Sequence, residues 1–555
     1  MNYKVTTTRL SVLILILFCF ACDNGKKNEQ TSIVPASRLY PKIEIPAQSL
    51  VIVDLVNDKI EGQVAACALQ GIVNRTSEEK IYVMNTLCRD NHGGWKDDTT
   101  DRQRSKQAQM GELWLKELFE NMPQKRLETD SSKENPGFMA LLEYALHYVK
   151  GIIIWDPKLE QATIEAAATI AGQTDGIIVS PDMAERLKGY NLPVIDDLQG
   201  KFINNIECLD WLIENYFEMA NKQVAFTWSH MTTDPENSWG GANKDYVIAN
   251  KLFTYFLDIQ IKEECAYYET IVKKYPEGTP IMGWTDELKA DKLFADYGYF
   301  MVPLISVENM TVMSSFPSVK GTMQTPKAYP IEDNAVYIAL FISDGDNLLH
   351  TMIYEPYTIM HTDDLDAVTT TWIINPAITD LAPPVFKWYE EKLKNHEIAG
   401  MMGDGSPISE RFAGFSFYCD FTKHYIKESG IRTIKHMVDA EAAAWRIQPY
   451  CMNGGYAGND WRGIGVYDYH MDNQTFHIGT TSLRESLFNN TINNAPKGEP
   501  LFLCAFIGGS HHDAPKRIKE VAESIKSRND GKKYYFVRSM DLAATYRAWK
   551  GLPNT

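Results

Sequence analysis

Strand-like apolar runs alternate with helix-period runs from residue 49 onward. SLVIVDL (49–55) and KIYVMN (80–85) flank a run at 60–72 whose apolar positions recur at helical spacing. GIIIW (151–155) continues the alternation after further helical patterns. Strands that alternate with helices in this way are typical of α/β domains with parallel sheets. We therefore expect residues 48–220 to form an N-terminal α/β layer domain.

Strand patterns become more regularly spaced in the second half of the chain. The nine candidates are TPIMGW (279–284), YFMVPL (299–304), AVYIALFI (335–342), AVTTTWII (367–374), IAGMMG (398–403), TIKHMV (433–438), GIGVYDYH (463–470), LFLCAFI (501–507) and YYFVR (534–538). Helical patterns follow several of them, most clearly at 383–394, 412–429, 515–527 and 540–549. Seven or eight such strands can close a parallel barrel with its helices outside. We therefore predict a TIM-like (β/α)7–8 barrel over residues 221–555.

Polar residues follow these candidate strands one after another. The clearest case is ISDGDN, in which Asp344 and Asp346 bracket Gly345 directly after the uncharged run at 335–342. A single acid at a strand end is more often a turn or a helix cap than a catalyst. Because all strands of a parallel barrel finish on the same side, however, recurring strand-end polar residues would meet at one mouth. The recurrence therefore predicts a polar site there.

Carboxylates and aromatic residues at this predicted mouth favour a carbohydrate substrate. Glycosidases flank the scissile bond with two carboxyl groups, and sugar rings stack on aromatic faces. We predict Asp344 as base or nucleophile, Glu441 as proton donor, and Asp346 and Asp404 as residues that orient substrate hydroxyls. The predicted substrate-binding residues are Trp284, Asn375, Trp445, Tyr467, Asp468 and His511. Core packing is the alternative role for the tryptophans.

Two other function classes stay open at this point. One is a metal-dependent hydrolase, such as a carbohydrate deacetylase, using Asp344, Asp346 and one histidine; the chain has no HExxH or HxxxH motif, and we assign no metal ligand and no other cofactor. The other is a non-catalytic surface glycan-binding lipoprotein. It would retain glycan without releasing product, and its binding would survive Glu441→Gln but not Trp284→Ala.

Charge and the first residues indicate where the protein acts. A net charge of −17 disfavours binding to nucleic acid. The apolar run at 12–20 is too short to cross a bilayer and is typical of a secretory signal. Because CFAC and a polar tail follow it, we expect removal of residues 1–21, lipidation of Cys22 and a tether over 22–47, with simple cleavage as the alternative. The protein would then be exported and anchored through lipid in the bacterial outer membrane, facing the periplasm or the surface.

Several stretches resemble the GxGYxYP putative glycoside hydrolase family. They are LQGIVNR (69–75), VAFTW (224–228), KKYPEGTPIMGWTDE (273–287), YGYFMVPLISVENMTVMSSFP (297–317), FISDGDN (341–347) and WIINPAITDLAPPVFKWY (372–389). ISDGDN and NPAITDLAP are the most specific of these elements. The resemblance implies an N-terminal α/β domain, a C-terminal barrel and a carbohydrate substrate. Where the family's naming motif should stand, residues 403–409 read GDGSPIS, which keeps both glycines but neither tyrosine nor the final proline.

Overall fold

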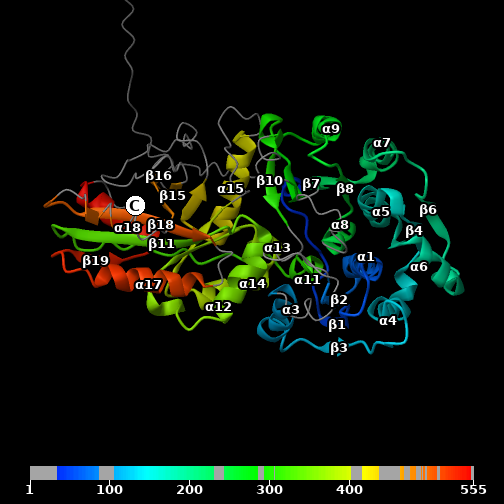
Figure 1. Ribbon diagram of the computed structural model, residues 1–555, viewed down its shortest axis with the longest axis horizontal. Coiled ribbons are helices and arrows are strands. Elements are labelled where there is room, and N and C mark those ends of the chain that lie inside the picture. Colours follow the sequence, from blue (N-terminus) through cyan, green and yellow to red (C-terminus); the bar gives the residue numbers. More distant parts are fainter. Residues whose placement is uncertain are drawn as a thin grey trace, which may run out of the picture. The chain divides into compact units, whose positions relative to one another are not determined.

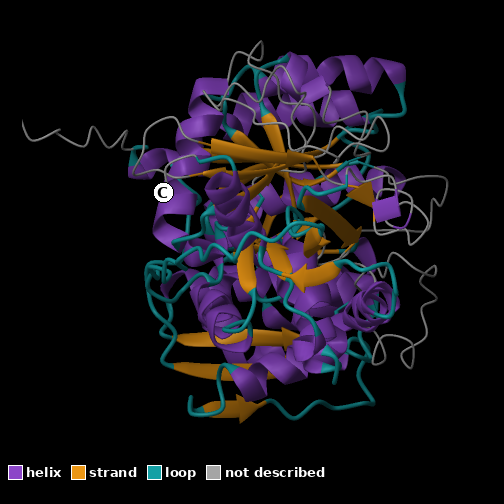
Figure 2. Cartoon of the chain, turned by 90° about the vertical axis from the view of Figure 1, so that its left-hand side faces the viewer, coloured by secondary structure: helices purple, strands orange, loops and turns teal. Residues whose placement is uncertain are grey.

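The strands of this protein form four separate sheets covered by helices, as Figure 1 and Figure 2 show. The computed structural model describes residues 34–86, 106–229, 243–285, 293–304, 307–401, 415–436, 463–467, 475–479, 481–482, 489, 492–493, 497–508 and 513–551. No helix in these ranges is both long enough and apolar enough to cross a membrane.

The first sheet confirms the strand–helix–strand order expected near residue 50. β1 (Ser49–Asp54) runs parallel to β2 (Glu79–Met84) on one side and β3 (Gln124–Arg126) on the other. α1 (Ile60–Thr76) is buried from residue 62 to residue 74, and its small residues allow close packing. At Gly71, for example, a Cβ would lie 2.6 Å from the backbone oxygen of Asp245, so only glycine fits against α8 (Lys244–Ala249).

Two further parallel sheets follow in the sequence. The second contains β4 (Gly151–Ile154), β5 (Gly176–Val179) and β6 (Val194–Asp197), with α5 (Glu160–Thr174) and α7 (Asn205–Tyr216). The third contains β7 (Asn221–Trp228), β8 (Leu252–Phe256), β9 (Pro280–Trp284) and β10 (Phe300–Pro303) in the order β10-β9-β7-β8. β9 and β10 were expected in the barrel, and this part of the prediction is wrong because both pair with β7 and its neighbours.

The fourth sheet carries the remaining candidate strands, but it is not a closed barrel. Its strands are β11 (Ala335–Ser343), β12 (Thr371–Ile374), β13 (Glu397–Gly400), β14 (Thr433–His436), β15 (Gly463–Tyr467), β16 (Thr475–Gly479), β17 (Thr481–Ser482), β18 (Leu501–Gly508) and β19 (Lys533–Phe536). Their order is β16-β15-β14-β13-β12-β11-β18-β17, with β19 also paired to β11. β15 is antiparallel to both of its neighbours, and no sheet in the described ranges closes on itself. The TIM-like barrel is therefore not confirmed, whereas the mixed α/β class is.

The first and third sheets are joined through a side-chain amide. Asn309, which follows β10 and has φ of 60°, accepts from the backbone N–H of Val83 at 2.8 Å. Its Nδ2 donates to the Val83 oxygen at 2.9 Å, and its Oδ1 also accepts from Gln70. The amide thereby satisfies both backbone groups of Val83 at this edge of β2.

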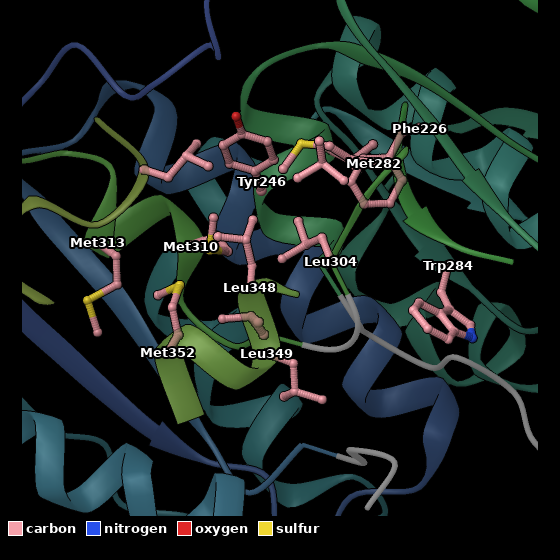
Figure 3. Close-up of a cluster of buried hydrophobic side chains, with 14 of the residues drawn as sticks. Phe226, Tyr246, Met282, Trp284, Leu304, Met310, Met313, Leu348, Leu349 and Met352 are labelled. Atoms are coloured by element: carbon pink, nitrogen blue, oxygen red, sulfur yellow. The ribbon is translucent and has the colours of Figure 1, made fainter. Parts of the chain in front are cut away.

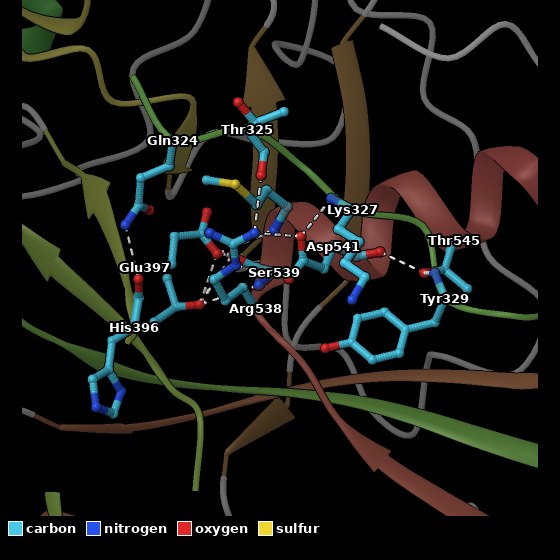
Figure 4. A network of polar contacts seen from close by, with 12 residues as sticks. Gln324, Thr325, Lys327, Tyr329, His396, Glu397, Arg538, Ser539, Asp541 and Thr545 are labelled. Atoms are coloured by element: carbon cyan, nitrogen blue, oxygen red, sulfur yellow. Dashed lines mark hydrogen bonds and ion pairs between the residues drawn. The ribbon is translucent and has the colours of Figure 1, made fainter. Parts of the chain in front are cut away.

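A buried carboxyl group lies at the end of the fourth sheet where its parallel strands begin. Glu397, at the start of β13, is fully buried and accepts from Thr371 Oγ1 at 3.0 Å and from Thr433 Oγ1. It also accepts from Ser539 Oγ at 2.7 Å and Met540 N at 3.1 Å, at the start of α18 (Ser539–Trp549). Figure 4 shows the part of this network around Glu397 and Ser539. One side chain thus binds three strands and a helix together.

Candidate active site

The turn after β11 holds two carboxylates in a constrained backbone. Asp344 has φ of 81°, a left-handed conformation that is uncommon for residues other than glycine. Gly345 packs on β12 so closely that a Cβ would lie 1.7 Å from the Ile373 backbone oxygen. Asp344 and Asp346 are half-buried on either side of it. The turn therefore fixes where both carboxylates leave the carboxyl end of the sheet, the edge at which α/β folds bind ligands.

We expect Gly345→Ala to destabilise this turn, because the added methyl meets backbone atoms that cannot rotate away. Overpacking of this kind costs about 1–3 kcal/mol or more. The measurement is the melting temperature of the variant. Gly189→Ala is the matched control, because a Cβ at Gly189 meets nothing within 4 Å and should leave the melting temperature close to that of the wild type. Equal melting temperatures for the two variants would contradict the packing argument.

The buried side chain of Asn375 and the hydroxyl of Thr351 connect this turn to the segment after β12. Asn375 is fully buried. Its Nδ2 donates to the backbone oxygen of Asp346 at 3.2 Å, and its Oδ1 accepts from the backbone N–H of Ala377 at 3.0 Å. Its backbone N–H donates to Thr351 Oγ1 at 3.1 Å, and that hydroxyl donates to the Gly345 oxygen at 2.9 Å. Asn375, predicted to bind substrate, thus lies beside Asp346 but serves to position the turn.

A π-helix follows the acidic turn. Residues His350–Tyr354 form this π-helix, and it continues directly into α12 (Glu355–Met360). Single π-turns inside helices are rare and are frequent at functional sites. The Thr351 oxygen accepts from the hydroxyl of Tyr389, in α14 (Pro383–Lys392), at 2.7 Å. Glu355, the residue that follows the π-helix, contacts the same hydroxyl.

Glu355 is a third carboxyl at this site, and it is fully buried. Burial raises the pKa of Glu355 well above its ordinary value, and the carboxylates of Asp344 and Asp346 raise it further. The Tyr389 hydroxyl lies 3.1 Å from Glu355 Oε2, and this contact opposes the rise. However, a phenol has one proton, and the Thr351 carbonyl can only accept it. A protonated Glu355 can donate to the Tyr389 oxygen while the Tyr389 hydroxyl donates to the Thr351 oxygen, so all three groups have partners. Geometry and burial therefore both favour a neutral Glu355 at pH 7.

We expect Glu355→Gln to stabilise the protein increasingly as pH rises. A carboxyl with a raised pKa in the folded state contributes stability that is fully present below its ordinary pKa, near 4.3, and is lost as pH rises toward the folded pKa. The neutral amide does not titrate, so the two proteins should diverge above about pH 4, by up to about 1.4 kcal/mol per pH unit. The measurement is the difference in melting temperature between variant and wild type from pH 4 to pH 8.

The control for this experiment is Glu391→Gln, because Glu391 is exposed near the end of the same α14 that carries Tyr389. Its melting-temperature difference from the wild type should stay constant with pH. A constant difference for Glu355→Gln as well would mean that Glu355 is not protonated in the folded state.

Trp284 lies in the hydrophobic core. It ends β9 with 6% of its surface exposed, inside the hydrophobic cluster of Figure 3, where Leu348 and Leu349 also lie. An exposed ring face is what sugar stacking requires. The predicted sugar-binding role of Trp284 therefore has no support from its position, and core packing, the alternative, describes it. Trp372, in β12, is also buried, with 1% exposed.

The other predicted residues are described only in part or not at all. Tyr467 ends β15 and pairs with Thr475 of β16. Outside the described residues lie Asp404, Glu441, Trp445, Asp468, His511 and the predicted lipidation site Cys22. Among the residues that are described, no three His, Cys, Asp or Glu side chains are grouped so that they could hold a metal ion. The acids that the structure brings together are thus Asp344, Asp346 and Glu355.

A cavity of about 880 Å³ lies elsewhere, beside the N-terminal segment of the described chain. It is lined by Tyr40 and by both members of two ion pairs, Lys42–Asp380 at 4.0 Å and Lys320–Glu428 at 3.7 Å. Because Asp380 and Glu428 of this cavity are paired with lysines, whereas the acids after β11 flank a strained turn, we place the candidate site at β11.

Three family models match consecutive parts of the chain. Residues 149–219 match the GxGYxYP_N second domain, 227–315 the GxGYxYP third domain, and 334–541 the GxGYxYP putative glycoside hydrolase C-terminal domain. These ranges correspond to the second, third and fourth sheets, and Asp344, Asp346 and Glu355 fall in the last. No curated protein sequence matches the chain significantly.

A solved structure shares the fold. It is a putative hydrolase from Bacteroides thetaiotaomicron VPI-5482, with a TM-score of 0.68 and 18% identity over 93% of this chain and 98% of that one. A putative polysaccharide deacetylase from Mycobacterium smegmatis has a TM-score of 0.27 and 11% identity, over 42% of this chain and 98% of its own. That second likeness is too low to carry an argument.

Proposed function

We propose that this chain, which belongs to the GxGYxYP putative glycoside hydrolase family, cleaves glycosidic bonds in an oligosaccharide or polysaccharide. The observation that carries the proposal is the group of three carboxyls at the end of β11. Asp344 and Asp346 are half-buried, whereas Glu355 is fully buried with a raised pKa. Asp344 and Asp346 supply carboxylates of the kind with which glycosidases flank the scissile bond, and a neutral Glu355 adds no third negative charge beside them.

In this proposal Asp344 acts as the nucleophile or base, and Asp346 and Asp404 orient substrate hydroxyls. Glu441, which follows β14 in the sequence, donates the proton to the leaving group. Glu355 is too deeply buried to contact a sugar. It contributes by staying neutral, because a third negative charge beside Asp344 and Asp346 would favour protonation of those two acids.

Substrate contacts in the proposal come from residues that follow other strands of the fourth sheet. Trp445 would stack on a sugar ring, and His511 would bind hydroxyls. Trp445 and His511 come after β14 and β18 in the sequence. Tyr467 is left out of the proposal, because β15 runs antiparallel to β14 and pairs Val466 with Thr433, at the end of the sheet opposite Asp344. Asp468, the next residue in the sequence, is left out with it. The departure from the family's naming motif at 403–409 suggests that this member recognises its own substrate.

The proposal is tested by incubating the purified protein with a panel of polysaccharides and oligosaccharides and measuring new reducing ends by mass spectrometry. Glycoside hydrolysis predicts shortened sugars with and without a chelator. Release of acetate from acetylated glycans, abolished by the chelator, would instead identify a metal-dependent deacetylase. Retention of a glycan on an affinity gel without any product would identify a binding protein.

We also propose that the protein is exported and anchored in the bacterial outer membrane through lipid on Cys22. The support is the sequence alone, an apolar run at 12–20 followed by CFAC and a polar tail. Mass spectrometry of the N-terminal peptide from protein made in a bacterial host with a lipoprotein export pathway tests this. A Cys22 that carries lipid is expected, and a Cys22 without lipid would contradict the proposal.

A further inference from the structure

Two backbone carbonyls of the π-helix accept hydrogen bonds from side chains outside the helix. The Thr351 oxygen accepts from the Tyr389 hydroxyl at 2.7 Å, and the Met352 oxygen accepts from the indole Nε1 of Trp114 at 3.1 Å. Trp114 belongs to α3 (Lys106–Glu117), 238 residues away in the sequence. Helix α3 stands beside the first sheet, so the helix that carries Glu355 is held partly from the N-terminal region of the protein.

Trp114 is itself fixed by the contact between α3 and α14. Its side chain is 2% exposed, and its ring meets that of Trp388 edge-on, with centroids 5.2 Å apart and planes at 88°. The Nε1 of Trp388 donates to Glu117 Oε2 at 3.3 Å, and Lys392 forms an ion pair with the same oxygen at 3.0 Å. Tyr389, the second donor to the π-helix, is the next residue along α14. The contact between α3 and α14 therefore positions both side chains that donate to the π-helix, Trp114 and Tyr389.

We infer that Trp114 is a positioning residue for the candidate active site: its indole N–H holds the π-helix in place so that Glu355 stays buried against Tyr389, behind Asp344 and Asp346. An α-helical register at His350–Tyr354 would rotate Glu355 relative to the wider π-turn. The backbone oxygens of Thr351 and Met352 would then have different hydrogen-bond donors. The two external donors select the register in which the carboxyl faces the acidic turn. The catalytic consequence of this inference rests on the proposed function; the structural coupling does not.

Trp114→Phe tests the coupling, because it keeps an aromatic ring against Trp388 and removes only the indole donor. The readout is hydrogen–deuterium exchange of peptides that cover residues 347–360. Losing one buried hydrogen bond corresponds to roughly 2- to 10-fold faster exchange in this segment. Trp388→Phe is the matched control, since it removes an indole donor from the same ring pair, but one whose acceptor is Glu117. It keeps the ring contact with Trp114 and the Lys392–Glu117 ion pair, so it should leave exchange in 347–360 unchanged.

Tyr389→Phe is a second probe, since it removes the donor to Thr351 and should accelerate the same peptides. Faster exchange in 347–360 for Trp114→Phe and Tyr389→Phe, but not for Trp388→Phe, is the expected result. Unchanged exchange for Trp114→Phe, or an equal acceleration for Trp388→Phe, would overturn the inference. Because exchange needs no substrate, this outcome is independent of whether the protein cleaves glycans.

The catalytic consequence is read from the pH profile of the reaction on a glycan that the wild type cleaves. Trp114→Phe should lower kcat more than it changes KM and should shift the pH profile, because the environment of Glu355 changes the charge balance at Asp344 and Asp346. A wild-type pH profile combined with faster exchange would show that the contact is structural only and would overturn this catalytic role. Absence of any cleavage by the wild type would count against the proposed function and would leave the exchange result to decide the coupling.

Discussion

We expect Asp344→Asn to lower kcat by about 10²–10⁴-fold, the range typical for loss of a positioned acid–base group. The substitution removes one charge and keeps the shape of the side chain. Asparagine also tolerates the left-handed conformation that position 344 adopts, with φ of 81°. The turn over Gly345 should therefore persist, and the loss should appear in catalysis and not in folding. Steady-state hydrolysis of a cleaved glycan, measured beside the melting temperature, separates the two effects.

Asp333→Asn is the matched control for this variant. Asp333 is exposed just before the other end of β11, so the same chemical change there should leave kcat unaltered. A variant at position 344 that retains wild-type kcat would remove Asp344 from the reaction. A comparable loss in Asp333→Asn would show that the assay responds to general damage.

We expect Glu397→Ala to destabilise the fourth sheet by about 3 kcal/mol or more. The substitution leaves the hydroxyls of Thr371, Thr433 and Ser539 and the N–H of Met540 without their acceptor in a buried site. An unsatisfied buried donor costs about 1–3 kcal/mol, and part of this cost is recovered where the hydroxyls find new partners. Native-state hydrogen exchange of β12 and β13 measures the loss as a local free energy of opening.

Glu391→Ala provides the comparison, because it removes a carboxylate from an exposed position near the end of α14. Changes there should stay within about 0.5 kcal/mol. If Glu397→Ala were equally mild, the network at the start of β13 would not hold α18 to the sheet. Since this network lies at the opposite end of the strands from Asp344, its loss should reduce stability without a specific effect on kcat.

Local structure was predictable where one apolar run carried the signal. The run at 335–342 predicted β11, and the acids after it predicted the turn. Both predictions succeeded because a strand and a turn depend on residues that are adjacent in sequence. Strand pairing was not predictable in the same way. β9 and β10 have the same pattern as β12 or β13, yet β9 pairs with β7 and β10 pairs with β9. β18 returns to β11 from about 160 residues away. Periodicity reports burial, and it does not report which strand becomes the neighbour.

The candidate site was predicted in part for the same reason. Asp344 and Asp346 follow a strand and could be found. Asn375 was expected near them and lies there, although its amide is used within the protein. Glu355 was missed because it stands in an apolar helical stretch, with no strand end or motif beside it. Its only signal was a single acid among apolar residues in LLHTMIYEPYTIM (348–360), which could have marked a buried carboxyl. Trp284 was predicted to bind sugar and is buried. The sequence could not separate the two roles, because a tryptophan at a strand end fits either a core or a stacking platform.

The most direct test of the central claim is a crystal structure of Asp344→Asn with an oligosaccharide that the wild type cleaves. The account predicts that the scissile bond lies within hydrogen-bond reach of the side chain at position 344, at about 3 Å, with Glu355 buried behind it. The distance from position 344 to the proton donor would also give the stereochemistry, about 5 Å for retention and roughly 6.5–9.5 Å for inversion. A sugar bound in the cavity beside Tyr40 and Lys42, with the turn after β11 empty, would contradict the account.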